Sequence, residues 1–201
     1  MITKTSFISL LVWIVFAGVA SRAQAGVFTM PHFVAPGEFS LGMEGELTLT
    51  HGAGAAANVK YTQGLNDLMN ATAILGTGGG PRKFRAGGNL IFDIFPDIEG
   101  QPGIGLGTQA LYYRLPEEVG QLELTAVPYI HKTFISAGNE IEPYFAIPFG
   151  AAFSEGRYKA ISNVAIGSMF KSVEHFRYTL EFGIAVNNSD TYVTGGVAYF
   201  H

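Results

Sequence analysis

The chain has 201 residues, of which 48% are hydrophobic and only 14% are charged. Soluble globular domains carry about a quarter charged residues, so this composition is not typical of that class. The absence of cysteine excludes disulfides, thiolate metal sites and a lipid-modified N-terminal cysteine. The length predicts a single domain.

Residues 1–25 have the features of a cleaved export signal. Lys4 precedes a hydrophobic stretch at residues 7–19, and Ala23-Gln24-Ala25 supplies the small residues that a signal peptidase needs. The stretch is too short to favour a membrane anchor. Cleavage after Ala25 removes two of the twelve basic residues and no acidic one, which leaves ten against sixteen and a net charge of −6. This balance argues against a nucleic-acid partner.

Residues 26–37 contain two prolines and no clear period, and they are predicted to form a periplasmic N-terminal tail. His32 in this tail is interpreted as a solvated side chain, because a metal site needs three or four convergent ligands. No metal site and no cofactor are predicted for the chain. The remaining residues, 38–201, are predicted to form the folded domain.

From residue 38 onwards, apolar and polar residues alternate with period two, which is the pattern of a two-faced β-strand. Such strands are expected at residues 38–50, 55–63, 68–77, 83–95, 103–114, 121–134, 140–153, 157–170, 176–186 and 191–200. The pattern is clearest at residues 176–186, where every even position is apolar and Arg177 and Glu181 share the other face. That strand would run ~35 Å, long enough to cross a hydrocarbon layer at a tilt.

The two faces of these strands indicate an inside-out arrangement. The apolar faces are continuous along strands longer than the usual five or six residues, the connections are short, and most charges fall on the second face rather than in turns. Lipid forbids unpaired strand edges, and closure removes them. The sequence therefore predicts an all-β fold, a closed up-and-down antiparallel transmembrane β-barrel of about ten strands, with eight or twelve as alternatives.

With these features the chain resembles the small outer-membrane β-barrel proteins of Gram-negative bacteria. The resemblance is carried by Ala23-Gln24-Ala25, the alternating segments, a tight turn at Gly64-Leu65-Asn66-Asp67 and the terminal Tyr199-Phe200. It implies location in the outer membrane, contact with outer-membrane lipids, and recognition of the last strand by the assembly machinery. His201 follows Phe200 and departs from the usual aromatic end. Two registers of the last strand are therefore considered, with either Val193, Val197 and Tyr199 or Tyr192, Thr194 and Phe200 facing the lipid.

The polar face is expected to line the lumen. Its candidate residues are Glu44, Glu46, Lys60, Arg85, Asp93, Glu123, His131, Glu142, Lys159, Arg177 and Glu181. One interpretation is a set of ion pairs that fills the interior, because buried charges must be paired. The other is a narrow polar conduit whose acidic excess favours cations. A wide diffusion pore is not expected, because barrels of ~8 strands are filled by side chains and ten strands are only slightly wider.

No catalytic residue is predicted. Glu123 and His131 share a face but lie ~26 Å apart along the strand, so they form no dyad. His131 could instead meet Glu140 or Glu142 across the next turn, as an ion pair. Gly103, Gly105 and Gly107 indicate close backbone packing within a strand rather than a phosphate loop.

Three prolines interrupt the pattern: Pro128 in one predicted strand, and Pro143 and Pro148 in the next. Proline removes a ladder donor, so these residues are expected at bulges or frayed positions. A sharper hypothesis is a lateral seam through which a lipid or an apolar solute passes sideways.

The sequence thus predicts a non-enzymatic outer-membrane barrel that is structural or forms a narrow polar conduit for small solutes or ions. Two rival hypotheses remain. A lipid-acting outer-membrane enzyme would need His131 or a carboxylate near it for turnover, and a secreted soluble β-barrel binding protein would bury its apolar faces.

Overall fold

The computed structural model describes residues 34–50, 53–78, 83–115, 119–136 and 138–201. The predicted export signal and His32 lie outside these residues. The strands are β1 (Phe39–Thr48), β2 (Gly54–Asn66), β3 (Met69–Gly78), β4 (Phe84–Phe95), β5 (Gly103–Arg114), β6 (Gly120–His131), β7 (Phe134–Ser136), β8 (Asn139–Ala146), β9 (Phe149–Ser154), β10 (Arg157–Val173), β11 (Phe176–Asn187) and β12 (Tyr192–Phe200). No helix in the described part of the chain is long and apolar enough to cross a membrane.

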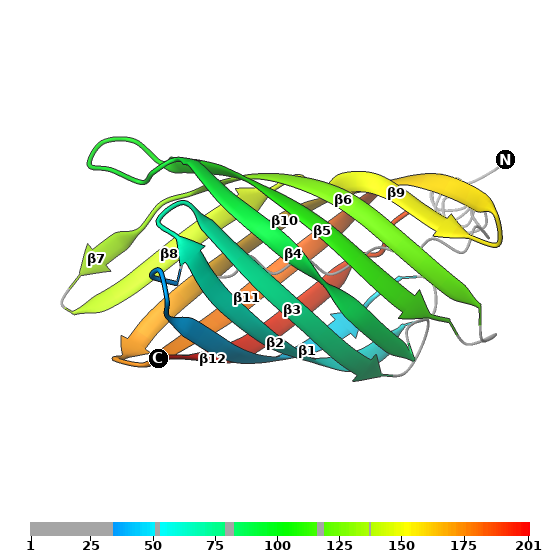
Figure 1. The fold of residues 1–201 in the computed structure, drawn as a ribbon, viewed down its shortest axis with the longest axis horizontal. Coiled ribbons are helices and arrows are strands. Elements are labelled where there is room, and N and C mark those ends of the chain that lie inside the picture. Colours follow the sequence, from blue (N-terminus) through cyan, green and yellow to red (C-terminus); the bar gives the residue numbers. More distant parts are fainter. Residues whose placement is uncertain (1–33, 51–52, 79–82, 116–118, 137) are drawn as a thin grey trace, which may run out of the picture.

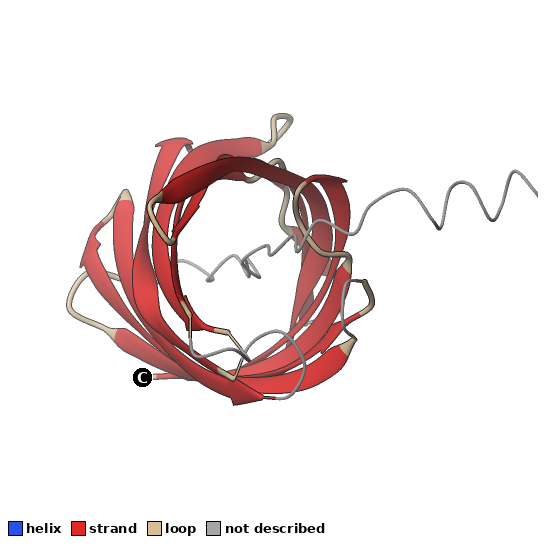
Figure 2. Ribbon diagram, turned by 90° about the vertical axis from the view of Figure 1, so that its right-hand side faces the viewer, coloured by secondary structure: helices blue, strands red, loops and turns tan. Residues whose placement is uncertain are grey.

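The strands form one closed antiparallel barrel (Figures 1 and 2). β12 pairs with β1 over nine residue pairs, from Ser40–Phe200 to Thr48–Tyr192, and this pairing closes the ring. β8 and β9 together fill one position between β6 and β10, while β7 pairs with β8 beyond the ring. The barrel therefore has ten strand positions and two extra strand segments, and the predicted fold class is confirmed.

The exposure of the side chains is inverted relative to a soluble protein. Met43 and Val186 are 64% and 65% exposed, whereas Glu46, Glu123 and Glu181 are 1% exposed. Along β1 and β11 the exposed apolar residues alternate with buried polar ones, because successive side chains point to opposite faces. The exposed apolar residues thus face outward, and most of the charged residues of the strands face the lumen.

Aromatic side chains gather near both ends of the outer face. At the end that carries the C-terminus, the Phe39 ring stacks on Tyr61 at 5.9 Å and the Phe176 ring meets Tyr199 at 5.5 Å. Near the other end, Phe153 and Tyr158 lie with their ring centroids 6.5 Å apart. Aromatic girdles at both interfaces are a property of outer-membrane barrels.

Two predicted strands are divided in the structure. The expected strand 121–134 ends at His131, with β7 as a separate segment, and the expected strand 140–153 is interrupted at 147–148. Pro148 has no N–H to give to the ladder, which accounts for the break. The register is nevertheless unchanged across it, because Ala126–Phe149 and Tyr129–Ala146 follow the same alignment.

The predicted tight turn at Gly64–Asp67 is displaced. β2 runs on to Asn66, and the turn consists of Asp67 and Leu68, where the Leu68 N–H donates to the Asn66 side-chain oxygen at 2.9 Å. Asparagine stabilises turns through this kind of local bond. Gly64 is therefore a strand residue, with its N–H bonded to the Glu38 carbonyl at 3.0 Å.

Candidate functional site

The lumen is the candidate site, and all eleven predicted residues occupy inward positions of their strands. Most are buried, Lys60 and Asp93 are partly buried, and Lys159 is exposed near the start of β10. The last strand has its outward face at Val193, Val197 and Tyr199 and its inward face at Tyr192 and Thr194, which resolves its register. The conduction role of these residues stays a prediction.

Two ion pairs join side chains of the inner wall, one between neighbouring strands and one between strands that are not paired. Lys60 of β2 donates to Glu44 of β1 at 2.8 Å. Arg85 of β4 donates to Glu46 of β1, and its guanidinium also lies over the Tyr113 ring, 5.5 Å from the centroid. Pairing of this kind is what allows charges to be held away from bulk water. The interpretation of the inner face as a network of ion pairs has its geometric basis in these contacts.

Glu181 is held differently, by two phenols. The Tyr144 hydroxyl of β8 donates to one carboxylate oxygen at 2.5 Å, and the Tyr192 hydroxyl of β12 donates to the other at 2.8 Å. The sequence reasoning did not single out either tyrosine. The available signal was that both tyrosines lie at inward positions of the alternating pattern. Their convergence on Glu181 of β11 depends on the curvature of the wall.

Each inward aromatic ring of this group lies over a glycine on the neighbouring strand. Tyr144 is paired with Gly167 and Tyr192 with Gly183, and a Cβ on either glycine would collide with the ring. The same relation joins Tyr129 to Gly105. The glycines therefore provide room for flat rings against the wall, in agreement with the close packing expected for Gly105.

His131 lies between two carboxylates at the end of the barrel that carries the C-terminus. Its Nδ1 is 2.7 Å from Glu142 Oε1, and its Nε2 is 3.7 Å from Asp93 Oδ1. Glu142 was one of the two partners expected across the turn, and Glu123 is not part of this cluster. Among the described residues, no group of three or more His, Asp or Glu side chains is arranged to hold a metal ion.

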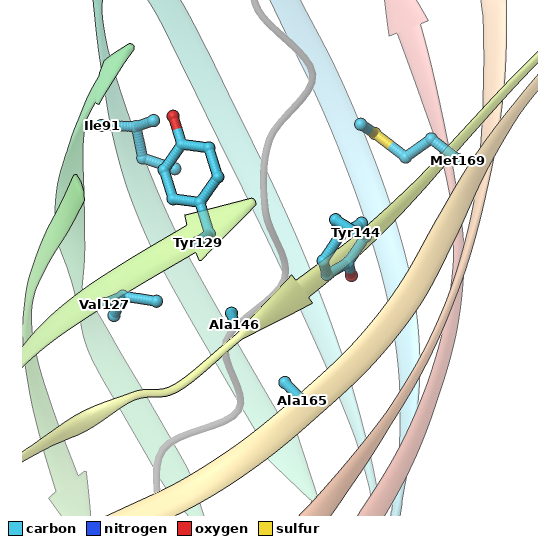
Figure 3. Close-up of a cluster of buried hydrophobic side chains, with 7 residues drawn as sticks. All are labelled: Ile91, Val127, Tyr129, Tyr144, Ala146, Ala165 and Met169. Atoms are coloured by element: carbon cyan, nitrogen blue, oxygen red, sulfur yellow. The ribbon is translucent and has the colours of Figure 1, made fainter. Parts of the chain in front are cut away.

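Part of the inner wall is apolar, which the sequence reasoning did not anticipate. A buried cluster on β4, β6, β8 and β10 faces the lumen (Figure 3). Its members are Ile91, Val127, Tyr129, Tyr144, Ala146, Ala165 and Met169. On β1, β2 and β12 the inner positions are mainly polar, with Glu44, Glu46, Asn58 and Thr194 buried. The lumen is therefore amphipathic, with an apolar wall and a polar wall.

The three prolines lie around the break between β8 and β9. Pro128 and Pro148 flank the interruption of the pairing with β6, and one bond crosses it, from the Ile147 N–H to the Pro128 carbonyl at 3.1 Å. Pro143 lies within β8 opposite Ser168, and its carbonyl accepts a hydrogen bond from the backbone N–H of Lys132 at 3.2 Å. The prolines thus keep their carbonyls in the ladder, and the lateral seam stays a prediction.

No protein-family model matches this chain, and no curated protein matches it. Solved structures do. The COG4313 outer membrane channel from Pseudomonas putida F1 aligns with a TM-score of 0.55 at 8% identity, over 88% of this chain and 100% of that chain. A KdgM porin aligns with a TM-score of 0.40 at 13% identity, over 80% of this chain and 98% of that chain. A structure described as de novo design of transmembrane beta-barrels gives 0.43 at 11% identity, over 85% and 100%.

At these identities the likeness concerns the fold. The similarity to the COG4313 channel agrees with the barrel described above, so the chain has the fold of a small outer-membrane β-barrel protein.

Proposed function

We propose that the mature chain is an integral outer-membrane barrel that acts as a narrow conduit for small solutes or ions, with a preference for cations. It is non-enzymatic in this proposal. Its outward face contacts outer-membrane lipids, and the strand that ends in Tyr199-Phe200 is recognised by the assembly machinery during insertion. Export through a cleaved signal at residues 1–25 brings it there.

The observation that carries the proposal is the charge of the inner face. Among the eleven candidate residues there are six carboxylates, against four lysines and arginines and one histidine. Glu44 and Glu46 are paired with cations, and Glu181 accepts hydrogen bonds from two tyrosine hydroxyls. An excess of carboxylates along a narrow passage lowers the barrier for cations and raises it for anions.

The width of the barrel limits the size of the solute. An interior of ~8 strands is just filled by side chains, so ten strands leave a small passage at most. This limit on the width supports small ions or small solutes rather than general diffusion.

The test is conductance in planar bilayers with the purified mature protein. Under a KCl gradient, the reversal potential should have the sign of cation selectivity. The variant Glu123→Gln should shift that potential toward zero, because one inward carboxylate is neutralised. Glu155→Gln is the matched control, since Glu155 lies in the exposed turn between β9 and β10. Absence of conductance from correctly folded protein would leave only a structural role.

A further inference from the structure

The residues just before β1 do not extend away from the barrel. Residues 34–37, here called the strap, turn back at Pro36 and Gly37, where Gly37 has a φ of +83° and the Glu38 N–H donates to the Ala35 carbonyl at 3.0 Å. Proline followed by glycine at the centre of a turn suits a type II geometry, because the third residue needs a positive φ. The turn brings Val34 over the inner wall, where it is only 4% exposed.

The inner wall beneath the strap has a glycine where the backbone of the strap approaches it. Gly64 of β2 lies directly under the carbonyls of Val34 and Ala35, and a Cβ at this position would overlap both backbones. Those carbonyls are main-chain atoms, so a larger residue could not be accommodated by a side-chain rotation. Only glycine permits this approach.

Opposite Gly64 in the ladder stands Asn70 of β3, whose side chain is fully buried. The surrounding donors and acceptors assign the amide nitrogen of Asn70 to the carbonyl side: so assigned, it donates to the Val34 and Met69 carbonyls, both at 3.2 Å, and the amide oxygen accepts from the Val34 N–H at 3.0 Å. A neighbouring β-strand would satisfy the same two groups in the same way. The contact involves only backbone atoms of residue 34 and is independent of its side chain.

We propose that Gly64 and Asn70 form a binding site for an extended polypeptide backbone on the inner wall, and that the chain's own strap occupies it and narrows the lumen. The inference rests on the proposed conduit for its functional consequence, but the binding itself does not depend on conduction. A passage through ten strands is narrow, so one added backbone segment on the wall takes a large share of it.

The binding is tested by thiol labelling. The chain has no cysteine, so Val34→Cys introduces the sole thiol. In folded protein this thiol should react slowly with a maleimide, and Asn70→Leu should speed the reaction by about tenfold or more, because two hydrogen bonds to the strap are lost. Asn70→Asp, which keeps the shape but loses the donor, should act in the same direction. Asn89→Leu is the matched control, since Asn89 is an inward residue of β4 opposite Thr72.

The narrowing is tested by conductance. Asn70→Leu and a mature chain that begins at Gly37 should both conduct more per channel than the full mature chain. A synthetic peptide with the sequence of residues 26–37 should return the shortened barrel toward the lower conductance, and a scrambled peptide should not. All variants are first checked for the gel shift of a folded barrel.

The outcomes separate the two proposals. Fast labelling of Val34→Cys in the parent, or no change with Asn70→Leu, overturns the binding site whatever the conductance. Protected labelling with equal conductance in all variants overturns the narrowing alone. Protected labelling with no conductance in any variant supports the binding site and overturns the conduit.

Discussion

Glu46 and Arg85 illustrate how single residues hold charge inside this barrel. The two side chains come from β1 and β4, both are nearly inaccessible, and Thr48 adds a hydrogen bond to the carboxylate at 3.2 Å. Removing one member of a buried pair leaves the other charge without compensation, which costs more than the pair itself contributes.

We therefore expect Arg85→Leu to lower the free energy of unfolding by about 3–5 kcal/mol. The measurement is urea-induced unfolding of the protein in lipid vesicles. The double variant Arg85→Leu with Glu46→Leu should recover most of the loss, because no lone charge remains. A loss below about 1 kcal/mol for the single variant would contradict the importance of this pair.

The contact of Tyr144 with Gly167 gives a second prediction at this scale. Gly167→Val should push the ring off the wall and separate its hydroxyl from Glu181, with a loss of about 1–3 kcal/mol in unfolding free energy. In a Tyr144→Ala background the same substitution should cost much less, because nothing remains to be displaced. Equal losses in both backgrounds would show that the ring is not what Gly167 accommodates.

At the scale of elements, the β4–β5 connection is tied to the link between β6 and β7. Lys132 donates to Asp97 at 2.5 Å and to the carbonyls of Ile98 and Gln101, and the Thr133 N–H donates to Asp97 at 2.6 Å. Burial by itself would raise the pKa of Asp97, but the bonds from Lys132 and Thr133 outweigh it and hold that pKa below its usual 3.8.

A group with a lowered folded-state pKa stabilises the fold above its unfolded value and loses that contribution as pH falls through the folded value. The Asp97 contacts should therefore be complete above about pH 4 and be lost only at lower pH. Hydrogen exchange of the Thr133 amide, corrected for intrinsic rates, is the readout. Asp97→Asn should weaken its protection at neutral pH, and an unchanged amide in that variant would rule out the tie.

The break between β8 and β9 is the other feature that belongs to this scale. The register continues through it, and the Asn163 N–H donates to the Pro148 carbonyl at 3.0 Å. We expect the Ile147 amide to be protected from exchange within about tenfold of amides in the β4–β5 ladder. Much faster exchange at Ile147 alone would instead favour lateral passage at the predicted seam.

For the whole molecule, closure is the property with the largest consequence. β1 and β12 pair along nearly their full length, so the ring has no free edge within its wall. The unboiled mature protein should therefore resist SDS and migrate differently from the boiled protein, and it should be found in the outer-membrane fraction. A soluble protein without a heat-dependent shift would contradict the outward assignment of the apolar face.

The sequence by itself determined which face of the strands points inward, except for the last strand, whose register the structure decided. Alternation is a local property of the extended chain, so Glu44, Arg85, His131 and Glu181 could be assigned to one face without knowing any pairing. The number of strands followed from the same count, with ten as the expected value. Export, assembly and conduction were implied at the level of a class and remain predictions.

Only the tertiary structure decided which inward groups meet. Glu46 and Arg85 are 39 positions apart, Tyr144 and Tyr192 reach Glu181 from different strands, and the strap contacts Asn70 across a reversal of the chain. These contacts depend on register, on the curvature of a closed wall and on the room left by glycines, none of which period two encodes. Gly64 illustrates the difference: its residue type suggested a turn, while the fold uses it as clearance for a backbone inside the lumen.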